Sequence, residues 1–240
     1  LPLAKSFNCI NSISIETNFK SLKRKIRKAR IKPKFYDPYI FYPNPLCYLR
    51  VHNILRKESI PTDQFINTQK FSQNNLDKNI VFKKKDFLSI TLRDYGPNKG
   101  RNTSQYDIDL AHQLAKDLNI GIIMIPDVIA NLKKYNTYDI KIINSARFNI
   151  YERLCIYNKS LVNIFSPAGT STASTFTKGA KTIITNYCNN EGEDSSETYF
   201  KKLYNLNIGD QPYLAFDTYL MWDGLYKNYK ISDLKEIMKI

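Results

Sequence analysis

The chain has 240 residues, of which 42% are hydrophobic, and its 36 Lys and Arg residues against 22 Asp and Glu residues give a formal net charge of +14. This apolar content supports a packed core and excludes wholesale disorder, and no apolar run approaches the roughly 20 residues of a membrane-spanning helix. The positive charge favours an anionic partner: a nucleotide, a nucleic acid or an anionic membrane surface.

The cysteines and histidines exclude several kinds of site. The four cysteines are widely spaced and form no CxxC pair, so neither a disulfide framework nor a zinc site is expected. The two histidines, His52 and His112, are too far apart in the sequence to suggest a metal site or a Ser-His-Asp triad. We expect reduced thiols in a cytoplasmic protein, because the N-terminus lacks the charged and apolar regions of a secretory signal.

Residues 1–80 differ in composition from the rest of the chain. They contain the basic run KSLKRKIRKARIKPK at 20–34, followed by a proline- and aromatic-rich stretch. Three prolines, Pro38, Pro43 and Pro45, exclude a long helix there. We expect a short, irregular N-terminal region.

The basic run itself has the pattern of an amphipathic helix. Phe19, Leu22, Ile26 and Ala29 share one helical face, and Lys and Arg residues surround it. Three interpretations stay open: a helix lying on an anionic membrane, a solvated helix packed on its own domain, and a nucleic-acid contact.

From residue 86 onward, strand and helix patterns alternate. Strands are predicted at 87–93, 120–125, 140–143, 161–165 and 182–185. Helices are predicted at 105–118 and 148–158, from 170, at 196–204 and at the C-terminus, where Ser232 is the expected cap. This alternation predicts an α/β fold, with a Rossmann-like parallel sheet in a second region at 86–240.

The first predicted strand ends in an arginine. Arg93 closes the apolar run, and a loop with Gly96, Pro97, Gly100 and Arg101 leads to the next helix. Ligands bind at the carboxyl ends of such strands, and a guanidinium group suits phosphate. The structural alternative is a strand that ends on a solvated arginine.

Two acidic features follow. Asp107 and Asp109 form a DxD pattern that could bind a metal ion, but in the first turn of a helix we favour a structural role. Asp127 follows the strand at 120–125, where a carboxylate could bind ribose or a base; we favour a cap of the next helix.

The segment LVNIFSPAGTSTASTF at 161–176 is a strand, a turn of small residues and a Ser/Thr-rich helix start. Exposed N–H groups and hydroxyls there suit an anion, although an ordinary capped turn has the same pattern. The candidates are Ser166, Gly169, Thr170 and Ser171. Trp222, the single tryptophan, is expected in the core.

The strand-end arginine of ITLRD and the serine turn of IFSPAGTS resemble the nucleotide-binding half of GT-B glycosyltransferases, especially the fucosyltransferase-like enzymes. In that family a basic motif, often HxRR, ends the first strand, and a serine-rich turn ends a late one. Here Arg93 matches the first motif, without its histidine and second adjacent arginine, and Ser166 matches the second. The resemblance covers residues 86–240.

The resemblance implies a metal-independent transfer of a sugar from a nucleotide-sugar donor to a glycan or lipid-linked acceptor, with no further cofactor. Arg93 would be the catalytic residue, neutralising the pyrophosphate with help from Arg101. Ser166, Gly169, Thr170, Ser171 and Asp127 would complete the donor site. Residues 1–80 are too few for a complete first domain and would form a reduced or truncated acceptor domain.

Two functions from other classes remain. A basic nucleic-acid-binding protein would rest on the net charge and the run at 20–34, but no RRM, KH or zinc-finger signature supports it. A non-catalytic interaction protein would rest on a degenerate nucleotide-binding domain. A peripheral membrane location through residues 20–34 accompanies the glycosyltransferase interpretation.

Overall fold

The computed structural model describes residues 86–94, 100–127, 140–189, 195–213, 217–222 and 231–239. Within these ranges, six strands form one sheet with all neighbours parallel, in the order β3-β2-β1-β4-β5-β6. The predicted α/β class with a Rossmann-like parallel sheet is therefore confirmed. The N-terminal region at 1–80, with its basic run at 20–34, lies outside the described residues.

The strands are short and largely buried. They are β1 (Phe87–Thr91), β2 (Gly121–Ile125), β3 (Lys141–Ile142), β4 (Asn163–Phe165), β5 (Thr182–Ile184) and β6 (Thr218–Leu220). The chain winds outward from β1 through β2 to β3, and then returns past β1 to β4 and winds outward the other way. The direction of winding therefore reverses between β1 and β4, at the centre of the sheet.

Helices lie between and after the strands. They are α4 (Gln105–Leu118), the 3-10 turn η6 (Ser145–Arg147), α5 (Ile150–Lys159), α6 (Gly169–Thr175), α7 (Glu197–Tyr204) and α8 (Ile231–Met238). α4 has the predicted bounds because both ends are capped. The Ser104 side chain accepts a hydrogen bond from the Asp107 amide, and the left-handed residue Asn119 ends the helix.

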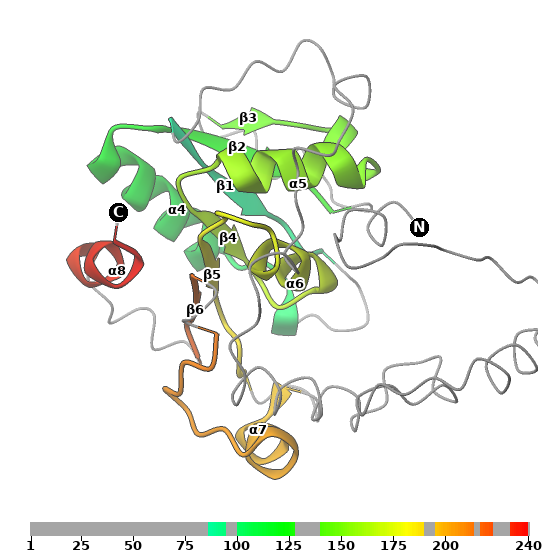
Figure 1. The fold of residues 1–240 in the computed structure, drawn as a ribbon, viewed down its shortest axis with the longest axis vertical. Coiled ribbons are helices and arrows are strands. Elements are labelled where there is room, and N and C mark those ends of the chain that lie inside the picture. The colour runs from blue at the N-terminus through cyan, green and yellow to red at the C-terminus, as the bar shows by residue number, and fades with distance from the viewer. Residues whose placement is uncertain are drawn as a thin grey trace, which may run out of the picture.

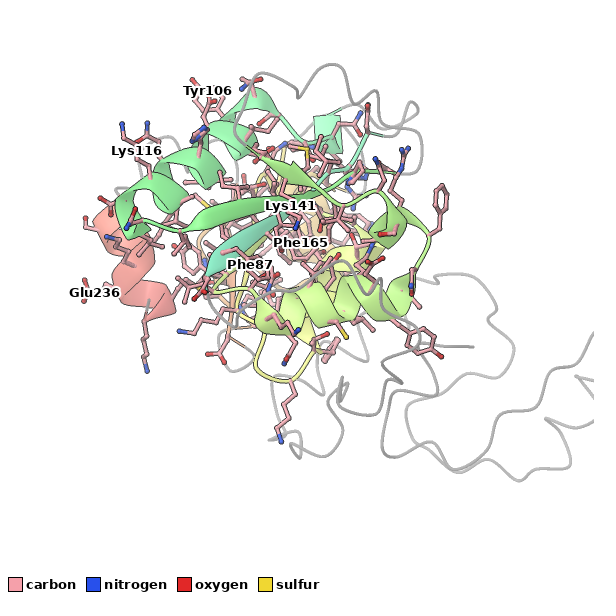
Figure 2. All side chains as sticks on the ribbon, turned by 90° about the horizontal axis from the view of Figure 1, so that it is seen from above. Phe87, Tyr106, Lys116, Lys141, Phe165 and Glu236 are labelled. Carbon is pink, nitrogen blue, oxygen red and sulfur yellow. The ribbon has the colours of Figure 1, made fainter. Side chains whose placement is uncertain are left out.

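The helices cover both faces of the sheet (Figure 1). α4 and α8 pack on one face through residues including Leu88, Ile90, Leu114, Ile164 and Leu234. α5 and α6 pack on the other through residues including Phe87, Ile125, Leu154, Tyr157 and Phe165. Figure 2 shows Phe87 and Phe165 between the strands and α5, while Tyr106 and Lys116 project outward from α4.

A third cluster surrounds α7. The rings of Tyr187, Phe200 and Trp222 lie 4.9–5.3 Å apart between centroids, and Trp222 is 2% exposed. The indole N–H of Trp222 donates to the Asp210 carbonyl at 2.7 Å. The expected core position of Trp222 is confirmed, and its partner satisfies the buried indole nitrogen.

Three expectations need correction. β6 was not predicted, because a three-residue strand has too little alternation to stand out from its aromatic surroundings. α8 begins at Ile231, so Ser232 lies inside the first turn instead of capping it. The helix predicted at 148–158 begins at Ile150, because the Asn149 side chain accepts from the Tyr151 and Glu152 amides.

In the described ranges, no helix has both the length and the apolar character to span a bilayer.

Candidate functional site

The two segments proposed from the sequence to bind phosphate leave neighbouring strands at the centre of the sheet. β1 and β4 are parallel, with Thr91 opposite Phe165 in register. Ser166 directly follows β4, and Arg93 lies two residues beyond the end of β1. In doubly wound sheets, ligands bind outside the carboxyl ends of the strands where the winding reverses. Both residues therefore stand at the edge of the sheet where ligands bind in this class of fold.

Thr103 connects the two strand ends. Its amide donates to the Arg93 carbonyl at 2.9 Å. Its hydroxyl oxygen accepts from the Arg93 amide at 2.7 Å and from the Ser166 hydroxyl at 3.0 Å. Thr103 is 7% exposed and Ser166 is 2% exposed. The Ser166 hydroxyl hydrogen is therefore engaged inside the protein, where it fixes the turn after β4.

The loop that leads into α4 is also bound to the segment after β5. The Gly100 carbonyl accepts from Asn186 Nδ2 at 2.8 Å and from Asn189 Nδ2 at 2.7 Å. Arg101 is half-buried, and its Nη2 donates to the Pro167 carbonyl at 3.4 Å. Residues 100–103 therefore contact the chain at the exits of three strands, β1, β4 and β5.

The positive charge of Arg101 also acts on Tyr187, which follows β5. Burial raises the pKa of the Tyr187 hydroxyl well above its usual value, and the guanidinium of Arg101 opposes that rise. The charge of Arg101 therefore acts at the exit of this strand.

The Ser/Thr-rich segment after β4 has two different sides. Ser171, Ser174 and Thr175 are buried. Ser171 donates to the Ala168 carbonyl at 2.6 Å, Ser174 Oγ lies 2.8 Å from Thr182 Oγ1, and Thr175 Oγ1 accepts from Thr218 at 3.2 Å. The hydroxyls of Ser174 and Thr175 therefore join α6 to β5 and β6, whereas that of Ser171 closes the turn before the helix.

The first residues of α6 remain accessible. Gly169 is exposed, and a Cβ placed on it would meet nothing within 4 Å. Thr170 is half-buried. Of the four donors expected in this segment, Gly169 and Thr170 are the two available to a ligand, whereas Ser166 and Ser171 are committed to internal hydrogen bonds.

Asp127 lies one strand away, at the exit of β2. Its Oδ2 accepts a hydrogen bond from the Asp94 amide at 2.8 Å, so it ties this exit to that of β1. The side chain is half-buried. The helix that Asp127 was expected to cap would fall at residues outside the described ranges. The carboxylate stands at the carboxyl edge, next to the strand that carries Arg93.

The DxD pair has the structural role that we favoured from the sequence. Asp107 Oδ2 accepts from the amide and hydroxyl of Ser104, at 2.6 and 2.9 Å, whereas Asp109 is exposed and accepts from Gln105. Burial raises the pKa of Asp107, and hydrogen bonds from Thr185 and Ser104 oppose the rise. In the part of the chain that the structure describes, no group of three or more His, Cys, Asp or Glu residues could hold a metal ion.

Polar side chains also connect η6, α5 and β1 on the face of the sheet that α5 covers. Ser145 Oγ donates to Glu152 Oε1 at 3.0 Å, and Arg153 Nε donates to the Ala146 carbonyl at 3.0 Å. Tyr157 Oη is 3.1 Å from Thr91 Oγ1 in the last residue of β1. Burial raises the pKa of Tyr157 to about 12, against the nearby charge of Arg153. The contact between Tyr157 and Thr91 joins α5 to the strand that leads to Arg93, and the other two contacts join α5 to η6.

Sequence reasoning missed Thr103, Asn186 and Asn189. Thr103 lies just before a recognisable helix cap, so nothing in its neighbourhood distinguishes it from an ordinary loop residue. Asn186 and Asn189 follow a predicted strand end, and Asn186 has a left-handed backbone with φ 48°. Their side-chain amides at a strand exit were the one available signal that a loop is held there.

Comparisons of the chain with protein-family models, with curated proteins and with solved structures gave no match.

Proposed function

We propose that residues 86–240 bind the nucleoside diphosphate of a nucleotide sugar at the carboxyl edge between β1 and β4, and that the protein transfers the sugar to a glycan or lipid-linked acceptor. One observation carries the proposal: Arg93 and Ser166 leave adjacent central strands at the reversal of winding and are joined through Thr103. The assignment to a GT-B-like glycosyltransferase rests on the motifs at these two strand ends.

In the proposed reaction, the arginines act on the leaving group. An acceptor hydroxyl oxygen forms a bond to the anomeric carbon as the bond between sugar and diphosphate breaks; the hydroxyl proton passes to water, and negative charge develops on the departing diphosphate. Arg93 neutralises that charge, and Arg101 assists from the neighbouring strand exits. Both side chains are half-buried, and a partly desolvated guanidinium stabilises an anion more strongly than a fully solvated one.

The other candidate residues divide into two groups. Gly169 and Thr170 supply N–H and hydroxyl donors to the phosphate oxygens, and Asp127 accepts from the ribose hydroxyls. Ser166 and Ser171 shape the turn that presents these donors, because their hydroxyls are already engaged. The net charge of +14 raises the local concentration of an anionic donor.

A thermal-shift screen of the full chain against GDP, UDP, ADP, CMP and their sugar conjugates tests the proposal. A nucleotide present at about 100 times its Kd should stabilise the protein by about 2.7 kcal/mol, or about 5–10 °C for a chain of this size. One nucleotide class should stand out, and its sugar conjugate should then lose labelled sugar to an acceptor.

The rival functions give different results. A nucleic-acid-binding protein would shift its melting temperature with a duplex oligonucleotide and with none of the nucleotides. A degenerate domain would bind the nucleotide but leave the labelled sugar on its donor. Either outcome would overturn the proposed transferase activity.

A further inference from the structure

We propose that Thr103 is the positioning residue of the diphosphate site, an inference that rests on the proposed nucleotide-binding function. Thr103 is buried, so it would influence a bound diphosphate through the two residues that it holds, Arg93 and Ser166, and not by direct contact. Its hydroxyl oxygen is the common acceptor of the Arg93 amide, at 2.7 Å, and the Ser166 hydroxyl, at 3.0 Å. One oxygen atom therefore joins Arg93, which follows β1, to Ser166, which follows β4.

The chemistry of this hydroxyl explains why its removal should be felt at Arg93. A hydroxyl oxygen can accept two hydrogen bonds, and here both come from groups inside the protein. An apolar side chain of the same shape would leave the Arg93 amide and the Ser166 hydroxyl without their acceptor. A buried donor without an acceptor is costly, so the strand exit moves until water or another acceptor satisfies it.

The backbone of Thr103 adds a second bond to the same residue. The Thr103 amide donates to the Arg93 carbonyl at 2.9 Å, so Arg93 is held by both its N–H and its C=O groups. On the other side of the loop, Asn186 and Asn189 hold the Gly100 carbonyl. Hydrogen bonds of residues 100–103 therefore connect the exits of β1, β4 and β5, and the Thr103 hydroxyl contacts the residues that follow both β1 and β4.

The test compares Thr103→Val with Thr103→Ser in the full chain. Valine keeps the branched shape and removes the acceptor, whereas serine keeps the acceptor. Thr182→Val is the matched control, because Thr182 is also buried and its hydroxyl lies 2.8 Å from that of Ser174. Thr182 begins β5, so it lies at the amino ends of the strands, away from the candidate site at their carboxyl ends. Calorimetric titrations with UDP and with GDP give the affinities, and melting temperatures give the effect on the fold.

We expect Thr103→Val to bind its diphosphate about 10- to 100-fold more weakly, the scale of one lost hydrogen bond to a charged group, because the displaced Arg93 no longer meets the phosphate. Thr103→Ser should restore the wild-type affinity, and Thr182→Val should retain it at a similar loss of melting temperature. Amide hydrogen exchange at Arg93 should be faster in Thr103→Val alone.

Wild-type affinity in Thr103→Val would overturn the inference and leave the proposed function standing. If the wild type binds no nucleoside diphosphate, the proposed function fails and this inference fails with it. Should Thr103→Val not fold, Ser166→Ala removes one of the two donors. Unchanged affinity in that variant would contradict the positioning role.

Discussion

Ser89 and Asn163 lie opposite each other in register on β1 and β4, and the Ser89 hydroxyl donates to Asn163 Oδ1 at 2.6 Å. The Asn163 amide nitrogen donates to the Tyr157 and Lys181 carbonyls, both at 3.0 Å. Both side chains are fully buried. A satisfied polar pair therefore joins the two central strands, and the carboxyl ends of these strands carry the candidate site.

Replacing Asn163 with Leu should destabilise the protein by about 3 kcal/mol, because the Ser89 hydroxyl and the Tyr157 carbonyl would be left buried with a partner removed. Urea denaturation measures the loss as a lower midpoint. Ser89→Ala should cost less, since it removes one bond and leaves the amide nitrogen of Asn163 paired. A loss below about 1 kcal/mol for Asn163→Leu would contradict this account of the sheet centre.

Asp107 should make the stability depend on pH. Because burial raises its pKa in the folded protein, the carboxyl contributes stability in its protonated form, and that contribution is lost as the pH rises through the folded-state pKa. Asp107→Asn keeps an oxygen to accept from Ser104 and carries no buried charge at any pH. It should therefore stabilise the protein at pH 7.5, by roughly 1 kcal/mol.

Urea midpoints from pH 4 to pH 8 test this prediction. The gap between Asp107→Asn and wild type should widen as the pH rises. The control, Asp109→Asn, changes an exposed carboxylate on the same helix and should produce no such trend. A wild type that gains stability over the variant at high pH would show that burial is not the dominant effect on Asp107.

Gly169→Val should separate ligand binding from folding. A Cβ at this exposed position meets nothing within 4 Å, and the backbone is not left-handed, so the melting temperature should change by about 2 °C or less. The added bulk would stand where the proposed phosphates approach the chain, so affinity for a nucleoside diphosphate should fall. Retained affinity would remove Gly169 from the site, and a parallel fall of both quantities would indicate a turn residue only.

The basic run at 20–34 should bind anionic lipid vesicles and leave neutral ones unbound. Eight of the residues from Lys20 to Lys32 are basic, and each contributes on the order of 1 kcal/mol at an anionic surface. Co-sedimentation at low and high salt measures this, with and without glutamine at Lys23, Arg24, Lys25, Arg27 and Lys28. Persistent binding after these changes, or stronger capture by a duplex oligonucleotide, would contradict the membrane interpretation.

Much of the fold could be predicted from local pattern. The bounds of α4 followed from its periodicity and its Ser104 cap, and the strand runs at 87–93 and 161–165 contain β1 and β4. β6 could not be predicted, because its three residues become a strand only through pairing with β5. The start of α8 could not be predicted either, because Ser232 lies inside the helix instead of before it. At the other end of α8, the Lys181 amine donates to the Lys239 carbonyl, a contact between residues far apart in the sequence.

The candidate site was predictable only in outline. A strand-end rule placed Arg93 and Ser166 at the carboxyl edge, and the sheet order then made them neighbours. The same Ser/Thr pattern after β4 fits either an anion site or a helix whose hydroxyls bond to the sheet. Only the structure shows that Ser174 and Thr175 face the sheet. The role of Thr103 depends on a loop path that no periodicity encodes.

Calorimetric titration of the full chain with GDP, UDP, ADP and CMP, in wild type and Arg93→Ala, tests the central claim most directly. Lys116→Ala is the matched control, because it removes one positive charge from the exposed surface of α4. The account predicts that one nucleotide class binds the wild type and Lys116→Ala alike. Arg93→Ala should bind it more weakly by about 2–4 kcal/mol, which is about 30-fold or more. Equal affinity in Arg93→Ala and wild type, or no nucleotide binding at all, would contradict the account.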